Sequence, residues 1–176
     1  ERELLTAQGG LKDREEARRE RGELARQLGD ISNRFGTLVE DIITPSLRRM
    51  AKAELGCGDE LFFGPRVTKT HPDGSGQRRE FDALYVGTQA ILLNESKATI
   101  RPEYAASFVE FLRSGAFFEY FPEYRGQPLV PVFSSLYLSA DIVAYLTRHG
   151  IYAVAMGDEA MEVLNREQVS ALRLAA

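Results

Sequence analysis

Three charged side chains near the middle of the chain have the types and spacing needed for metal-assisted chemistry on a phosphate. Asp82 is followed, after twelve intervening residues, by Glu95-Ser96-Lys97. Residues 80–86 and 90–98 each read as a β-strand, and Thr88-Gln89 lies at the turn between them. A loop of two or four residues there sets Asp82 directly across from Glu95, with Cβ atoms about 4.5–5.5 Å apart.

The alternation of side chains along a strand adds Lys97 to the face that carries Glu95. Two opposed carboxylates repel each other, and a bound Mg²⁺ converts that repulsion into coordination. Lys97 then lies where a phosphate or an attacking water would sit. The alternative is a plain salt bridge between Lys97 and Asp82 or Glu95 at the edge of a sheet. Either way, charges at the end of an apolar strand face must be paired or metal-bound.

The remaining elements predict an α/β sandwich with a mixed sheet. A long helical region ends at Gly56-Cys57-Gly58, and strands are expected over 61–70, 80–86, 90–98, 129–138 and 151–156. Helices are expected over 101–120 and from Ser139 to about His149. Residues 158–176 fit either a short strand or a helix. Three strands followed by a crossover helix and a buried strand give a mixed central sheet with helices on its faces.

The N-terminal helix carries two apolar sets. The first recurs at spacings of four and three, which is a heptad seam: Leu24, Leu28, Ile31, Phe35, Leu38 and Ile42. The second is suited to packing on the sheet: Val39, Ile43, Leu47 and Met50. Pro45 either kinks the helix or begins a second helix capped by Thr44.

We expect a second copy of the chain to cover the seam, giving a homodimer through the N-terminal helix. The alternative is that residues 1–20 or the C-terminal tail cover it within one chain.

Composition excludes several classes of protein. The chain has 176 residues, a net charge of −4, one cysteine and two histidines, so an internal disulfide is excluded and a structural zinc site is not expected. No apolar run approaches the ~20 residues of a membrane span. No signal peptide is recognised, and because the chain begins at Glu1 we expect further residues to precede it. A reducing, cytoplasmic location is expected.

Together these residues resemble the PD-(D/E)XK nuclease superfamily, which has the restriction-endonuclease-like fold. The resemblance rests on Asp82, Glu95-Ser96-Lys97, and a G-x-x-x-E motif at Gly36 and Glu40 in the preceding helix. It covers roughly Gly29 to Met156 and is strongest for bacterial members that carry a helical, coiled-coil-like extension. Phe81 stands where the family name has proline.

The resemblance implies an αβββαβ core and hydrolysis of phosphodiester bonds in nucleic acid, DNA being the expected substrate, to give a 5′-phosphate and a 3′-hydroxyl. It implies that Asp82 and Glu95 bind Mg²⁺, with Mn²⁺ as a substitute and the Ser96 carbonyl as a further ligand. Glu40 would assist as a further metal ligand, directly or through water, and the alternative is an exposed glutamate at the edge of the buried helix face. Lys97 would orient the attacking water. No membrane association is implied.

The chain is expected to have two parts. We expect residues 1–28 to form a charged helical extension and residues 29–176 the nuclease-like domain. The competing interpretation is a non-enzymatic assembly or nucleic-acid-binding module built on a nuclease-like scaffold.

Arginines and a lysine outside the triad are further candidates for phosphate contacts, with ordinary surface charge as the alternative: Arg48, Arg49, Lys52, Arg78 and Arg79. An aromatic cluster is a candidate for base stacking, although core packing is favoured: Phe117, Phe118, Tyr120, Phe121 and Tyr124.

Overall fold

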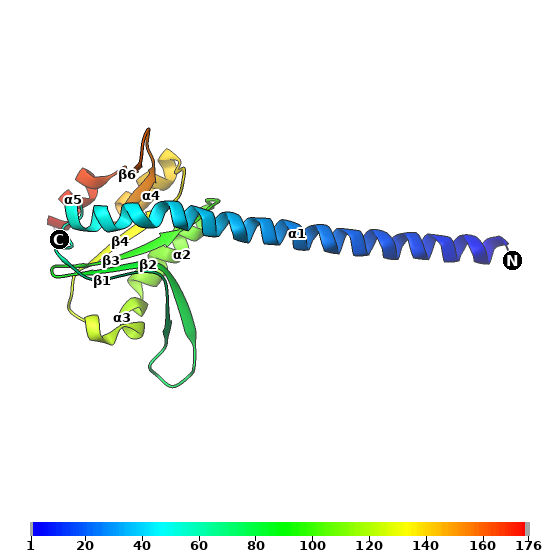
Figure 1. Ribbon diagram of the computed structural model, residues 1–176, viewed down its shortest axis with the longest axis horizontal. Helices are drawn as coiled ribbons and strands as arrows, with labels where there is room; N and C mark the ends of the chain where they lie inside the picture. The colour runs from blue at the N-terminus through cyan, green and yellow to red at the C-terminus, as the bar shows by residue number, and fades with distance from the viewer. Residues whose placement is uncertain (1, 175–176) are drawn as a thin grey trace. The chain divides into compact units, whose positions relative to one another are not determined.

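A computed structural model describes residues 2–174 of the chain, and side chains for residues 15–173 apart from 17 and 25 (Figure 1). The chain divides into two compact units, Glu1–Leu38 and Val39–Ala176. The predicted boundary after residue 28 falls inside a helix and stays a prediction. The elements, in chain order, are α1 Arg2–Ala53, β1 Glu60–Thr70, β2 Arg78–Gly87, β3 Ile91–Ser96, α2 Pro102–Arg113, α3 Ala116–Tyr120, the 3₁₀ helix Pro122–Tyr124, β4 Leu129–Ser134, α4 Ala140–Arg148, β5 Tyr152–Met156, β6 Met161–Val163 and α5 Arg166–Leu174.

The first unit consists of the N-terminal part of α1. Its described side chains are almost all exposed, as expected for a densely charged helix whose Glu15 and Arg19 lie one turn apart. The seam side chains are also exposed, from 38% for Ile42 in the second unit to 63% for Ile31.

Within the second unit, the C-terminal part of α1 packs on the sheet through the predicted second apolar set. Val39, Ile43, Leu47 and Met50 are all essentially inaccessible to solvent. The helix continues through Pro45. Thr44 is therefore not a helix cap, and its hydroxyl donates to the Glu40 carbonyl at 2.7 Å.

The six strands form one mixed sheet in the order β1-β2-β3-β4-β5-β6. β1, β2 and β3 pair antiparallel, β3, β4 and β5 pair parallel, and β6 is antiparallel to β5. One core layer joins the sheet to α2, α3 and α4, and the other joins it to α1 and α5. The predicted α/β class and αβββαβ element order are confirmed.

One local prediction needs correction, and one open choice between strand and helix is resolved. The single helix expected over 101–120 is two helices, because Gly115 adopts the left-handed conformation (φ 74°) between α2 and α3. Residues 158–176, left open between strand and helix, contain both β6 and α5.

The β2–β3 hairpin has the register that the two-residue loop predicts. The Gly87 amide donates to the Ala90 carbonyl at 3.0 Å across Thr88-Gln89. The paired residues run from Val86 opposite Ile91 to Ala83 opposite Asn94. The turn is also docked on the loop after α1, because the amides of Gln89 and Ala90 both donate to the Cys57 carbonyl.

We predict that Gly87→Ala destabilises the protein by about 1–3 kcal/mol, because a Cβ at residue 87 would lie 1.9 Å from the Cys57 carbonyl oxygen. Thermal unfolding followed by circular dichroism measures the effect. The matched control is Gly29→Ala, where the added methyl meets no atom within 4 Å and helix propensity favours alanine. Equal melting temperatures for Gly87→Ala and the unmodified protein would contradict the close approach.

Candidate functional site

The carboxyl end of β3 carries the predicted Glu95-Ser96-Lys97 motif. Ile91 and Leu93 belong to the core layer beneath α2 and α4, and alternation places Glu95 on that same face. Lys97 Nζ donates to Glu95 Oε1 at 2.6 Å, and both side chains are largely but not fully buried. This contact is the salt bridge between Lys97 and Glu95 that the alternative interpretation of the motif expects.

Asp82 lies across from this motif. The pairing of β2 with β3 ends at Ala83 opposite Asn94, the step before Asp82 and Glu95, and it has the register that the loop length predicts. The backbone amide of Ser96 donates to Asp82 Oδ2 at 2.7 Å. Phe81 packs in the same core layer as Leu84, so the regular alternation of β2 is broken at Asp82. The carboxylate is thus held against the end of β3 by a backbone hydrogen bond.

The surroundings of Asp82 disfavour its charged form. Burial, and then the nearby charge of Glu95, raise the pKa of Asp82 to about 6. The Ser96 amide and the Lys97 charge act in the opposite direction, and Glu40 adds a smaller increase. Burial also lowers the pKa of Lys97, but the charge and hydrogen bond of Glu95 outweigh this and raise it above its ordinary value. Lys97 is therefore a cation throughout the physiological range.

Glu40 reaches this region from α1 but is held by an arginine. Arg66 Nε donates to Glu40 Oε2 at 2.7 Å, and its Nη2 donates to Asp41 Oδ1 at 2.9 Å. Arg66 has a positive φ of 49° and lies between Pro65 and Val67, where the pairing of β1 with β2 is interrupted. The sequence does not predict this contact of Arg66, because it depends on how β1 lies against α1.

A buried polar network anchors the other face of β3. The Asn94 amide donates to Ser96 Oγ at 2.7 Å, and Ser134 Oγ donates to Asn94 Oδ1 at 2.7 Å. The Ser96 and Ser134 hydroxyls lie 3.0 Å apart. The network ties β3 to β4 on either side of Glu95, so it fixes the strand that presents the charged pair.

The structure thus brings Asp82, Glu95, Ser96 and Lys97 together, with Glu40 close enough to influence Asp82. Across the part of the chain that is described, no group of three or more acidic, histidine or cysteine side chains is arranged as a ready metal-binding cluster. The predicted metal site stays a prediction.

Other candidates from the sequence have structural roles. Arg48 bonds to Glu60, Arg49 to Glu54, and Lys52 to Asp59. The guanidinium of Arg79 lies 3.9 Å from the centre of the Phe111 ring. Three members of the aromatic cluster, Phe117, Tyr120 and Phe121, are in the core, which confirms packing over stacking.

Comparisons with known proteins assign neither a family nor a function to the chain. No family model and no curated protein matches the chain. Among solved structures it is similar to the small subunit of the heterodimeric restriction endonuclease R.BspD6I, with 14% sequence identity and a TM-score of 0.34. The similarity covers 65% of this chain and 63% of that subunit. A likeness this weak assigns no function. No helix in the described residues has the length and hydropathy of a membrane span.

We predict that Asp82→Asn stabilises the metal-free protein at pH 8. Because the pKa of Asp82 is raised in the folded state, ionisation of Asp82 costs folding free energy above pH about 6, and the cost fades as the pH falls toward the unfolded-state value of about 4. We expect a gain of about 1–2 kcal/mol at pH 8 that shrinks below pH 6.

Thermal unfolding in EDTA between pH 4 and pH 8 measures this gain. Asp158→Asn, at an exposed aspartate of the same charge, is the matched control. A destabilising Asp82→Asn at pH 8, or a gain that does not change with pH, would contradict the electrostatic account.

Proposed function

We propose that this protein is a Mg²⁺-dependent nuclease that hydrolyses phosphodiester bonds of nucleic acid, with DNA as the expected substrate. The observation that carries the proposal is the placement of Asp82, Glu95 and Lys97 at one end of the sheet, with the pKa of Asp82 raised to about 6. Groups whose pKa is shifted both by burial and by a specific charged neighbour are concentrated at functional sites. Membership of the PD-(D/E)XK superfamily is part of this proposal.

The donor set fits Mg²⁺. Asp82 and Glu95 offer carboxylate oxygens, and Mg²⁺ is commonly held by one or two carboxylates together with waters and substrate phosphate. The backbone carbonyl of Ser96 is the proposed further ligand, and Mn²⁺ the substitute ion. When bound, the ion supplies Lewis-acid stabilisation of charge on the phosphate oxygens. Glu40 is engaged by Arg66, so we assign it an outer role that acts on the charge of Asp82.

The side chains then have separate tasks. Lys97 remains protonated because Glu95 raises its pKa, so it acts as a cation that orients water and balances charge building on the phosphate, rather than as a base. The Ser96 amide keeps the Asp82 carboxylate in place. The network of Asn94, Ser96 and Ser134 keeps the end of β3 rigid beneath them.

We predict that the protein cleaves DNA in Mg²⁺ or Mn²⁺ and not in EDTA, and that Lys97→Ala lowers the rate by about 100-fold or more. Gel assays with labelled single- and double-stranded DNA and RNA measure this. Lys52→Ala is the matched control, because that lysine pairs with exposed Asp59 away from the site. Absence of cleavage on all substrates, with each metal, would favour the non-enzymatic scaffold instead.

We also propose that the protein is a homodimer assembled through the seam of α1, and that it works in the cytoplasm. Six large apolar side chains at heptad spacing are exposed on one helix, and a second copy offers an identical stripe to cover them. The sole cysteine, Cys57, is free, as a reducing compartment allows. The alternative cover by residues 1–20 falls partly outside the described side chains.

For the dimer we expect twice the chain mass by light scattering at tens of micromolar protein. The double variant Leu28→Glu, Ile31→Glu should give the monomer mass, because four buried carboxylates would repel one another in the seam. A double variant on the polar side of the same helix, Arg26→Glu with Asn33→Glu, is the matched control. A monomeric mass for the unmodified protein would rule out the dimer.

A further inference from the structure

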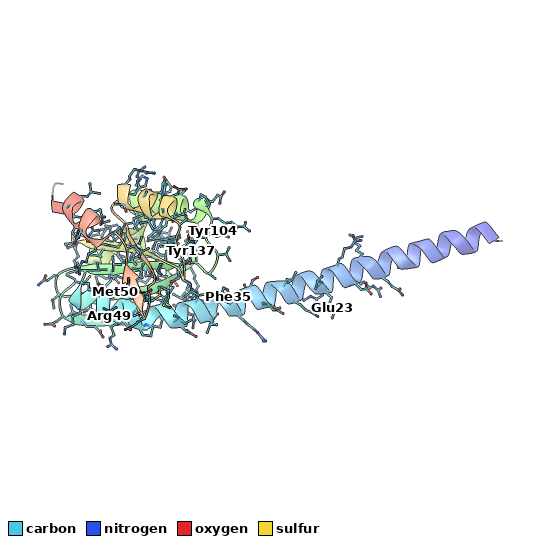
Figure 2. The ribbon with its side chains drawn as sticks, turned by 90° about the horizontal axis from the view of Figure 1, so that it is seen from above. Glu23, Phe35, Arg49, Met50, Tyr104 and Tyr137 are labelled. Atoms are coloured by element: carbon cyan, nitrogen blue, oxygen red, sulfur yellow. The ribbon has the colours of Figure 1, made fainter. Side chains whose placement is uncertain are left out.

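Two tyrosines, one largely and one partly exposed, lie on the segments that follow β3 and β4. β3 and β4 run parallel and end together, with Ser96 paired to Ser134, and the Lys97 amide donates to the Ser134 carbonyl at 3.0 Å. Tyr137 follows three residues after Ser134 and is 76% exposed. Tyr104, in the first turn of α2, is 37% exposed and its ring centre lies 5.8 Å from Lys97 Nζ. Figure 2 shows both tyrosines at the same end of the second unit.

Their exposure differs from that of the other aromatic residues nearby. Phe117, Tyr120 and Phe121 are in the core, where large rings contribute most to stability. Tyr137 gains little from such packing, because three quarters of its surface remains in water. Sites that bind single-stranded nucleic acid combine positive charge with aromatic side chains on which bases stack.

The neighbouring charges suggest which ligand. Lys97, 5.8 Å from the centre of the Tyr104 ring, and the exposed Arg101 carry positive charge on the segment that leads from β3 into α2. A polymer that offers flat rings and a phosphate backbone together is a nucleic acid strand. In a duplex the base faces are stacked on one another, so only unpaired bases can stack on a tyrosine.

We infer that Tyr137 and Tyr104 form a stacking platform for unpaired nucleotides, so that the substrate class is single-stranded or locally unpaired nucleic acid. This inference rests on the proposed function, because it places the platform beside the phosphate that Lys97 would contact. Tyr137 is the decisive residue, since Tyr104 also touches Lys97 and its removal would disturb the charged group.

The test is equilibrium binding in EDTA, where cleavage is suppressed, by fluorescence anisotropy of a labelled strand of about 20 thymidines and of a blunt duplex of the same length. We expect Tyr137→Ala to weaken single-strand binding about 10-fold, the size of one lost base stack, and to leave duplex binding within about two-fold. Tyr137→Phe, which keeps the ring, should bind like the unmodified protein.

A matched control comes from the opposite end of the sheet. Leu172 is 48% exposed on α5, next to Arg173, which donates to the Leu129 carbonyl at the start of β4. Leu172→Ala should leave both affinities unchanged. A strand containing 2-aminopurine adds a direct readout, because stacking quenches its fluorescence and Tyr137→Ala should abolish that quenching.

The outcomes separate this inference from the proposed function. Unchanged single-strand affinity in Tyr137→Ala, an equal loss on strand and duplex, or no single-strand binding by the unmodified protein overturns the platform, even if the protein cleaves DNA. Tyr137-dependent binding and quenching without cleavage in any metal supports the platform and removes the nuclease proposal.

Discussion

The hydrogen bond from the Ser96 amide to the Asp82 carboxylate is the constraint around which the charged end of the sheet is built. It holds a negative charge where burial and Glu95 both oppose ionisation. Other contacts fix the backbone on either side of this hydrogen bond. On one side the hairpin turn is docked on the Cys57 carbonyl, and on the other the Asn94, Ser96 and Ser134 network ties β3 to β4. The electrostatic cost of ionising Asp82 is therefore accompanied by well-fixed backbone on both sides.

The two faces of β3 carry different kinds of polar residue at its carboxyl end. Its apolar side chains alternate between the two core layers up to Leu93, and then polar residues take over on both faces. On one face the polar groups satisfy one another and stay buried. On the other, Glu95 and Lys97 keep partial access to solvent. This strand of six residues thus packs in the core at its first half and holds the charged side chain of Glu95 near solvent at its second half.

Much of this was predictable because it depends on periods and loop lengths. The parity of the Thr88-Gln89 turn predicted the register that pairs Ala83 with Asn94, and the 3.6-residue period of α1 identified Ile43 and Leu47 as core residues. The unpredicted features depend on contacts between segments distant in sequence. The pairing of Glu40 with Arg66 brings α1 and β1 together, and the left-handed conformation at Arg66 has no glycine or asparagine to announce it in the sequence.

Cys57 has a consequence of a different kind. It is the sole thiol among 176 residues, it is inaccessible to solvent, and burial raises its pKa to about 11. A thiol reagent can therefore reach it only when the layer between α1 and the sheet opens. The native chain thus contains its own reporter of that opening, placed directly beneath the turn that sets the strand register, without any engineered label.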